Sequence, residues 1–237
     1  MDKNITKARA YFYEFLAYPL FFHTSDEKFA RWREQLSYLA QNPLSEQSAE
    51  AFANLEEFSF KELVNEQNEV LFGFTNIPLS ASFYEEGRDN GAARLRVIHC
   101  LNLSPYRRDK ELCKDSEDYV GFIFLAMATF LNDEFNDAKN ISDKLFSETL
   151  NLFVDEFGSL LLAHKNANFF RSYAIILKDF IELERAVLSV EAPAKPQGDS
   201  VAMAALKKEP FQSKMPTIKT KLHWEEFSPV ISHEFKD

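Results

Sequence analysis

A run of 13 uncharged and mainly apolar residues, 119–131, constrains the fold of this chain more than any other feature of its sequence. The run is too short to cross a lipid bilayer, which takes roughly 20 residues, so we expect a buried helix there and no membrane span. A helix that is apolar on all sides usually lies at the centre of a protein. We therefore expect other helices to surround this one.

Helical periodicity continues through most of the first 190 residues, because apolar side chains recur at intervals of three and four. Six glycines and nine prolines are few for 237 residues, which favours long helices over a turn-rich β fold. The predicted helices cover residues 5–16 and 29–39, begin near Ser45, Ser59 and Gly87, and then cover residues 119–131, 140–164 and 166–189. Residues 73–82 contain Pro78 and several hydroxyl side chains, so we expect an ordered loop there.

The composition changes after residue 190, where Ala, Pro, Lys, Gln and Gly form a linker without helical periodicity. Residues 1–190 hold 20 basic and 30 acidic side chains, a net charge of −10. Residues 195–221 hold six Lys against Asp199 and Glu209, a net charge of +4 that is complementary to the preceding part. The sequence therefore predicts an all-α protein, with a single helical bundle domain over residues 1–190 and a C-terminal extension, a linker and tail, over residues 191–237.

The net charge of the whole chain, −10 with a pI of about 5.1, would repel nucleic acid and attract basic peptides. At the N-terminus, Lys7, Arg9 and Glu14 interrupt the apolar stretch that a signal peptide requires. The two cysteines, Cys100 and Cys113, form no CxxC motif, so we expect reduced thiols and neither zinc nor a disulfide. These features predict a cytoplasmic protein without a nucleic-acid partner or stable membrane insertion.

Known catalytic motifs do not occur in the sequence. It contains no Walker motif, Gly-rich dinucleotide loop, HExxH or GxSxG. His99 and His164 have no companion ligands at a defined spacing, so we interpret both as structural. We therefore predict no enzyme activity, no catalytic residue, no metal site and no cofactor. A small-molecule enzyme in a helical fold and a general helical adaptor or regulatory protein remain as alternatives.

Three segments carry a family signature when they are taken in order. In the first, Leu71 and Phe72 are followed by Pro78 and then by a Ser-x-Tyr ending at Tyr84, with acidic residues after it. The second, residues 117–127, places an Asp nine residues before a Met. The third comprises His164, the Phe-Phe-Arg-Ser-Tyr-Ala segment at 169–174 and a terminal Glu-Leu-Glu at 182–184.

These segments, spanning about half of the chain, resemble the TorD/DmsD/NarJ family of molybdoenzyme maturation chaperones. Asp118 and Met127 keep the spacing of the family's Pro-Asp-His motif and its following Met. Glu117, Tyr119 and Ile123 stand where the family has Pro, His and Glu, so a role that needs an imidazole is not supported. The resemblance implies a TorD-like helical bundle.

The resemblance also implies a partner, an apo-molybdoenzyme catalytic subunit and its twin-arginine signal peptide, held until the cofactor has been inserted. Clients in the family include N- and S-oxide reductases, nitrate reductase and formate dehydrogenase. The altered Pro-Asp-His segment and the long tail favour formate dehydrogenase over an N-/S-oxide reductase. The protein could be a monomer or a domain-swapped dimer, with residues 132–139 as the candidate hinge.

A twin-arginine signal peptide presents two guanidinium groups followed by a mildly apolar stretch, so its binding site needs carboxylates beside an apolar groove. The predicted client-binding carboxylates are Glu85, Glu86, Asp115, Glu117 and Asp118, and the predicted apolar wall consists of Phe83, Tyr84, Tyr119, Phe122 and Met127. The same residues have a structural interpretation, in which residues 115–118 cap a helix, Glu85 and Glu86 are solvated, and the apolar side chains fill the core.

Two further segments have alternative interpretations. Arg107 and Arg108 look like a twin-arginine pair but lie in mid-chain, and we interpret them as solvated surface. Residues 191–237 are either a disordered extension or a segment that folds back. In the second case, lysines and apolar residues of the tail would occupy the client groove or bind a second protomer. The apolar residues are Phe211, Met215, Ile218, Leu222, Trp224 and Phe227.

Overall fold

The computed structural model describes residues 3–21, 26–73, 76–133, 138–194 and 197–207 of the 237-residue chain. Contacts between residues group Met1–Leu206 into one compact unit and Lys207–Asp237 into a second. In the described residues the regular secondary structure is helical and no strand is present, which confirms the predicted all-α class. The apolar and basic tail residues from 208 onward lie outside the described residues.

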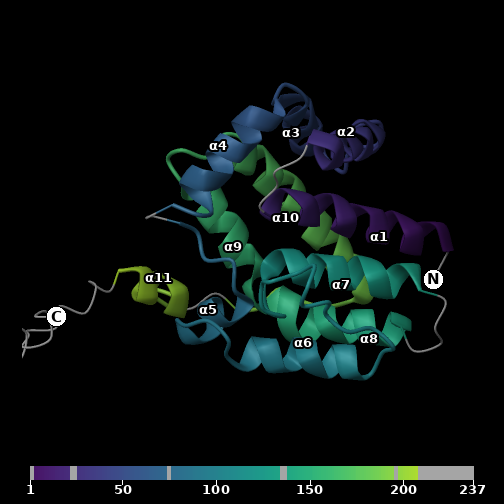
Figure 1. The fold of residues 1–237 in the computed structure, drawn as a ribbon, viewed down its shortest axis with the longest axis vertical. Helices are drawn as coiled ribbons and strands as arrows, with labels where there is room; N and C mark the ends of the chain where they lie inside the picture. The colour runs from purple at the N-terminus through teal and green to yellow at the C-terminus, as the bar shows by residue number, and fades with distance from the viewer. Residues whose placement is uncertain (1–2, 22–25, 74–75, 134–137, 195–196, 208–237) are drawn as a thin grey trace, which may run out of the picture. The chain divides into compact units, whose positions relative to one another are not determined.

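The order of the elements follows the predicted helices closely. The helices are α1 (Lys3–Ala17), α2 (Asp26–Leu39), α3 (Glu46–Glu56), α4 (Phe60–Val70), α5 (Ala81–Glu86), α6 (Ala92–Asn102), α7 (Val120–Asn132), α8 (Ala138–Leu145), α9 (Asn151–Ala163), α10 (Phe169–Leu188) and α11 (Val201–Leu206) (Figure 1). A 3₁₀ turn at Tyr18–Leu20 follows α1, and a π-helical turn at Phe146–Leu150 joins α8 to α9.

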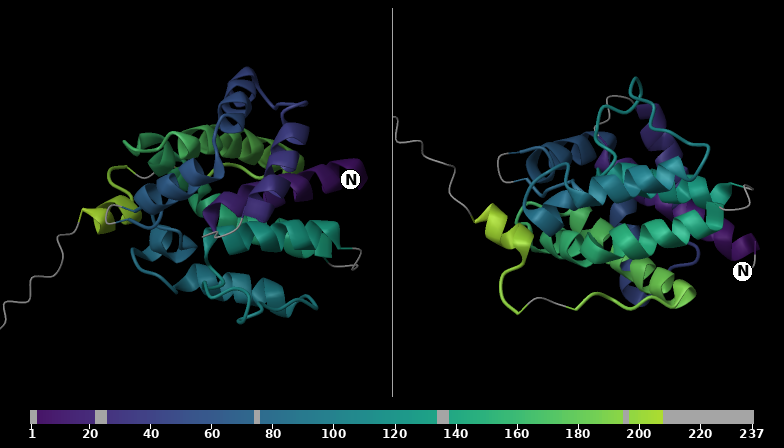
Figure 2. Two further views of the ribbon diagram at one scale, coloured as in Figure 1. Left: turned by 45° about the horizontal axis from the view of Figure 1, so that its top comes forward. Right: turned by 90° about the horizontal axis from the view of Figure 1, so that it is seen from below.

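The apolar helix α7 lies at the centre of one layer of the bundle, as its sequence predicts. It packs along α1 on one side and against α8 on the other, and α6 packs against α8 (Figures 1 and 2). Most of its residues are buried, including Ile123, Phe124 and Met127. One face remains accessible, because Leu125 is 39% exposed.

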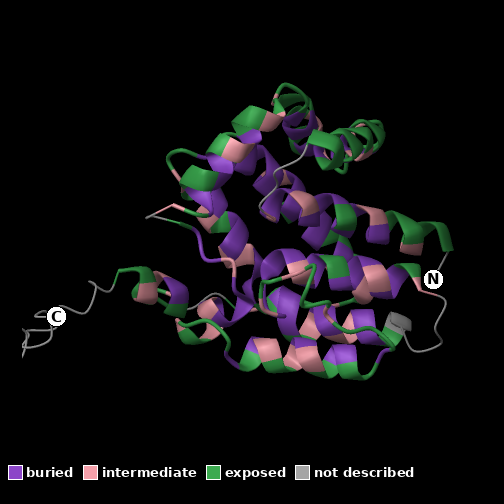
Figure 3. Cartoon of the chain, in the orientation of Figure 1, coloured by how far each residue is buried: buried purple, intermediate pink, exposed green. Residues whose placement is uncertain are grey.

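The other layer is built around α10, which packs against α3 and α9. Where α1, α2 and α10 approach one another, aromatic rings fill the core, and buried residues line the inner sides of these helices (Figure 3). The Trp32 ring stacks on Phe15 with 5.2 Å between ring centroids, and its Nε1 donates a hydrogen bond of 3.1 Å to the Phe15 carbonyl oxygen. Phe169 of α10 contacts the same indole at 5.5 Å. This aromatic cluster connects α1 and α2, near the beginning of the chain, with α10, which comes much later in the sequence.

Capping side chains explain why two of the predicted helices begin where they do. Ser45 accepts a hydrogen bond from the Ser48 N–H, and Ser48 in turn accepts one from the Ser45 N–H. Ser59 and Glu62 form the same reciprocal pair at the beginning of α4. Each capping box satisfies N–H groups that the helix itself leaves without partners.

The structure corrects the sequence prediction in three places. The predicted beginning of a helix at Gly87 is instead the end of a short helix, α5, where Gly87 adopts a left-handed φ of 68°. The predicted helix over 140–164 contains the π-helical turn between α8 and α9. The sequence did not predict α11, which packs against α5 and buries Ala202. Short helices carry too few turns to give a clear period, so local patterns miss them.

Within the described ranges, none of the helices combines the length and the apolar character needed to cross a bilayer. Half of the candidate hinge for a domain swap, 132–139, falls outside the described residues, since residues 134–137 are not among them. The swap therefore stays a prediction.

Candidate functional site

Two of the three family-like segments meet at an antiparallel bridge between Ser80 and Tyr119. The Ala81 N–H donates to the Asp118 carbonyl oxygen at 2.8 Å, and the Val120 N–H donates to the Leu79 carbonyl oxygen at 2.8 Å. This bridge joins the chain just before α5 to the chain just before α7. The first and second segments are thus parts of one site.

Asp118 holds this junction together from the inside. Its carboxylate accepts a hydrogen bond of 2.7 Å from the Ser80 hydroxyl and another from the Ser116 hydroxyl, and its exposed fraction is 0%. Burial opposes ionisation, but hydrogen bonds from Ser116, Ser82 and Ser80 together hold the pKa of Asp118 below its ordinary value. Asp118 is therefore not available on the surface for a client's arginine in this structure, and its contacts are those of a structural residue.

Glu117 lies between two arginines. One carboxylate oxygen accepts from Arg94 Nε at 2.7 Å, and the other accepts from Arg108 Nε at 2.9 Å. Burial opposes its ionisation, but the hydrogen bond from Arg94 and the charge of Arg108 hold the pKa of Glu117 below its usual value. The interpretation of Arg108 as solvated surface is wrong, because its side chain is 12% exposed and paired with Glu117. Arg107 is exposed, as predicted.

Glu85 and Glu86 lie on α5, and both have partners within the chain. Glu85 forms an ion pair with Arg96 of α6. Glu86 pairs with Arg88 at 2.7 Å and accepts the Ala92 N–H at 2.5 Å, which caps the beginning of α6. That backbone hydrogen bond and the one from Arg88 lower the pKa of Glu86. The two glutamates join α5 to α6.

The predicted apolar wall is mostly part of the interior. The Tyr84 hydroxyl donates to the Pro78 carbonyl oxygen at 2.8 Å, and the Tyr119 hydroxyl donates to the Leu20 carbonyl oxygen. Burial raises the pKa of both phenols. Met127 is 0% exposed. Phe83 and Phe122 are partly exposed and pack against the core. The structural interpretation of Tyr84, Tyr119 and Met127 thus agrees with their burial.

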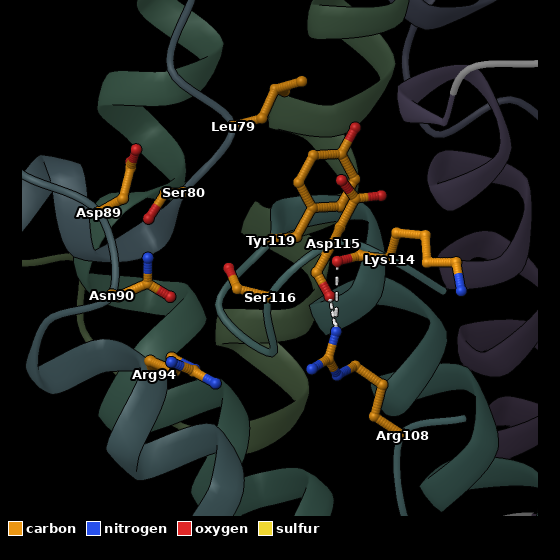
Figure 4. Close-up of a pocket in the computed structure, with 10 residues that line it drawn as sticks. All are labelled: Leu79, Ser80, Asp89, Asn90, Arg94, Arg108, Lys114, Asp115, Ser116 and Tyr119. Carbon is orange, nitrogen blue, oxygen red and sulfur yellow. Dashed lines mark hydrogen bonds between the residues drawn. The ribbon is translucent and has the colours of Figure 1, made fainter. Parts of the chain in front are cut away.

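A surface pocket of about 510 Å³ lies beside the bridged loops. The residues that line it are Leu79, Ser80, Asp89, Asn90, Arg94, Arg108, Lys114, Asp115, Ser116 and Tyr119 (Figure 4). Among the predicted client-binding residues, Asp115 and Tyr119 belong to this lining. Glu117 is paired with two of the lining arginines, and the glutamates of α5 are not part of the lining.

The charged groups of the pocket are arranged around its rim. Arg94 and Arg108 approach from opposite sides in Figure 4, and Asp89 and Asp115 also lie opposite each other. Asp89 and Asp115 are exposed residues. Although Asp115 is exposed as a whole, partial burial of its carboxyl group raises its pKa, and the charge of Arg108 partly offsets this effect. The pocket therefore combines two exposed acids with the ammonium of exposed Lys114 and with two guanidinium groups that are already engaged.

Asp89, Asn90 and Arg94 line the pocket but were not predicted as site residues. Asp89 and Asn90 follow α5 in a tight turn, in which Asn90 has a φ of 59°, and Arg94 lies in the first turn of α6. The Asp-Asn-Gly sequence at 89–91 is a recognisable turn signal. The pairing of Arg94 with a residue 23 positions further on has no such local signal.

The third family-like segment contributes to the framework. Glu66 accepts hydrogen bonds from the N–H groups of Asn168, Phe169 and Phe170 at 2.8–2.9 Å, which caps the beginning of α10. Glu184, near the end of α10, accepts from buried Arg9 at 2.5 and 2.9 Å. These two carboxylates fix both ends of α10.

The described part of the chain contains neither a cluster of metal-binding side chains nor a disulfide. No group of three His, Cys, Asp or Glu residues is placed there to hold a metal ion. Cys100 and Cys113 are free thiols, and burial raises the pKa of Cys100 to about 11. The His164 Nδ1 accepts a hydrogen bond of 3.3 Å from the Asn166 N–H, which is a local structural contact.

The chain matches a known protein family. The sequence model of the family described as nitrate reductase delta subunit matches residues 29–160, more than half of the chain. The match includes the loops that form the bridge and the pocket. A search of curated proteins gave no match.

Proposed function

The chain belongs to the nitrate reductase delta subunit family, the NarJ/TorD type of molybdoenzyme maturation chaperone, and from this we propose that it binds an apo-molybdoenzyme catalytic subunit through its twin-arginine signal peptide. In this proposal the protein acts by binding, without catalysis, and works in the cytoplasm before export of the client. It releases the client once the molybdenum cofactor has been inserted. Formate dehydrogenase or an N-/S-oxide reductase is the proposed client.

The pocket at the Ser80–Tyr119 bridge is the observation that supports this proposal most directly. It lies where two family-like segments meet, and its rim carries the exposed carboxylates of Asp89 and Asp115. A carboxylate forms strong, charge-assisted hydrogen bonds with a guanidinium group. Two such groups beside one pocket are suited to adjacent arginines in an extended peptide.

The proposed contact carboxylates are those that are exposed and also line the pocket. Asp115 remains from the predicted carboxylates, and Asp89 joins it. Phe83 and Phe122 remain as proposed apolar contacts, because both are partly exposed. In the unbound protein, the other predicted residues support the site through the bridge, the ion pairs of the three glutamates and the core. They are Tyr84, Glu85, Glu86, Glu117, Asp118, Tyr119 and Met127.

The proposal is tested with a fluorescent synthetic signal peptide that carries the arginine pair, and with a second peptide in which both arginines are lysines. We expect the full-length protein to bind the arginine peptide more tightly, because a planar guanidinium can bind a carboxylate through two hydrogen bonds. The double variant Asp89→Asn/Asp115→Asn should weaken binding about tenfold, the loss of roughly 1.4 kcal/mol from two exposed ion pairs.

A matched control removes the same charge elsewhere. Glu34 and Glu50 are exposed residues of α2 and α3, so Glu34→Gln/Glu50→Gln tests the effect of net charge alone. Equal binding of both peptides, or equal weakening by both double variants, would contradict a pocket for the arginine pair. Co-purification with an apo-molybdoenzyme precursor then identifies the client. Retention of unrelated proteins alone would favour the general adaptor.

A further inference from the structure

Arg108 lies in a nearly complete guanidinium-binding site formed by its own chain. Its Nε donates to Glu117 at 2.9 Å. Its Nη1 donates to the carbonyl oxygens of Asp115 and, at 3.3 Å, of Cys113. These acceptors come from residues 113–117, so the chain after α6 turns back to surround the arginine that it carries.

This cluster of acceptors selects a guanidinium group. A carboxylate and several carbonyl oxygens around one side chain match the fork of donors that arginine presents in a plane. A lysine ammonium has three donors on one atom and cannot reach acceptors placed on two sides. The Glu117 side chain is only 10% exposed, which limits competition from water.

The occupied site is adjacent to the pocket. Arg108 is part of the pocket lining, and its guanidinium lies directly below Asp115 in Figure 4. Arg94 shares Glu117 from the other side at 2.7 Å. Removal of Arg108 would therefore leave Glu117 with one partner, and would open acceptors toward the pocket.

Arg107, the residue before Arg108, is also held through its guanidinium group, so the two residues resemble the arginine pair of a bound peptide. Arg107 donates its Nη1 to the Leu101 and Ser104 carbonyl oxygens at 2.6 and 2.8 Å. Consecutive arginines are thus both held by oxygen acceptors, with Arg107 exposed and Arg108 partly buried beside the pocket.

We propose that Glu117 and the carbonyl oxygens of Cys113 and Asp115 form a guanidinium-binding site that Arg108 fills in the unbound protein, and that an arginine of a bound peptide replaces Arg108 there. The inference rests on the proposed function, since it identifies where one arginine of the signal peptide binds. The exchange replaces one guanidinium by another, so the charge around Glu117 stays balanced. Arg108 moves into solvent as the peptide enters.

Such self-occupancy lowers the apparent affinity for the peptide, because only the fraction of molecules with Arg108 displaced can bind. Titration of the arginine peptide into Arg108→Ala should therefore give a dissociation constant about tenfold lower than that of the wild type. Arg108→Gln, which cannot form the ion pair, should shift it in the same direction. Arg31→Ala, an exposed arginine of α2, removes the same charge and should leave binding within about twofold.

A second measurement tests the site without a signal peptide. Arginine amide should raise the melting temperature of Arg108→Ala more than lysine amide does, because it refills the vacated site. The wild type, whose site is filled, should respond equally to the two amides.

The outcomes separate the two proposals. If the wild type binds the arginine peptide and both Arg108 variants bind it equally well or more weakly, self-occupancy is refuted and the chaperone function stands. If no variant binds the peptide, the proposed function fails, and preferential stabilisation by arginine amide still decides whether the site exists. Should circular dichroism show that Arg108→Ala is unfolded, Arg108→Gln decides both measurements.

Discussion

The carboxylate of Glu66 in α4 accepts the backbone N–H of Phe169 at 2.9 Å, across 103 positions of sequence. The N–H groups of Asn168 and Phe170 bind the same carboxylate. A helix normally receives such a cap from a residue at its own beginning, and Asn168 provides no side-chain cap here. A distant helix thus completes the N-terminus of α10.

Glu66→Ala should lower the free energy of unfolding by about 2–3 kcal/mol, because it leaves buried N–H groups without an acceptor. Urea denaturation measures this loss. Glu69→Ala, at an exposed position on the same helix, should cost less than about 0.5 kcal/mol. Equal losses for the two variants would show that the cap contributes little.

Breaking the Arg9–Glu184 ion pair should destabilise the protein more than removing the Glu66 cap. Both side chains are buried, with 1% and 0% exposed, and the Tyr13 hydroxyl donates to Glu184 at 2.8 Å. Glu184→Ala should destabilise the protein by about 3–5 kcal/mol because it leaves a buried cation without its main partner, whereas Tyr13→Phe should cost about 1 kcal/mol. Chemical denaturation with Glu182→Ala as the exposed control tests the order; a smaller loss for Glu184→Ala than for Tyr13→Phe would contradict it.

Alanine substitution at two glycines should change the free energy of unfolding in opposite directions. Gly87 has a φ of +68°, and an added Cβ would lie 3.0 Å from the Ala205 Cβ of α11, so Gly87→Ala should destabilise by about 1–2 kcal/mol. Gly158 is helical with nothing within 4 Å of such a Cβ, so Gly158→Ala should stabilise by about 0.5–1 kcal/mol. Thermal unfolding distinguishes the signs. Adding Ala205→Gly to Gly87→Ala should recover the part of the loss that comes from α11.

The carboxylates of Asp118 and Glu117 should make the stability of the protein sensitive to acid. The pKa values of Asp118 and Glu117 are lowered by folding, so their contribution to stability is present above the unfolded-chain values of about 3.9 and 4.3 and is lost as the pH falls through the folded-state values. The free energy of unfolding should therefore decrease steeply below about pH 4. Asp118→Asn should be less stable at neutral pH and lose less on acidification. Urea unfolding across this range checks the prediction, and parallel pH curves for wild type and variant would overturn it.

The sequence predicted the structure best where the residues that define a helix lie within or directly beside that helix. Ser45 and Ser59 mark helix beginnings through contacts only three residues long, and both predictions are confirmed. The apolar run at 119–131 predicted a central helix because such a helix needs packing partners around it, and α7 packs against α1 and α8 with Leu125 left accessible. The family-like spacing also located the bridged loops, although it did not reveal that Asp118 would be buried there.

Local patterns were least informative about electrostatic partners. Glu85 and Glu117 look like free acids in the sequence, but Arg96 of α6 pairs with Glu85. Glu117 pairs with Arg94 of α6 and with Arg108 of the following loop. Such pairs depend on how helices dock, and no spacing rule within one helix encodes them. The same reason explains why Arg108, exposed by the usual expectation for an arginine, is largely enclosed.

The bridge between Ser80 and Tyr119 divides the pocket into a fixed wall and an adjustable one. Backbone hydrogen bonds of 2.8 Å tie the beginnings of α5 and α7 to each other, so these ends cannot separate without breaking both. Apart from Arg94 of α6, residues 86–91 and 103–116 carry the rest of the lining and are held mainly by side chains. Any change in the size of the pocket must therefore come from these two loops or from the Arg94 side chain, while α7 and the core beneath it keep their positions.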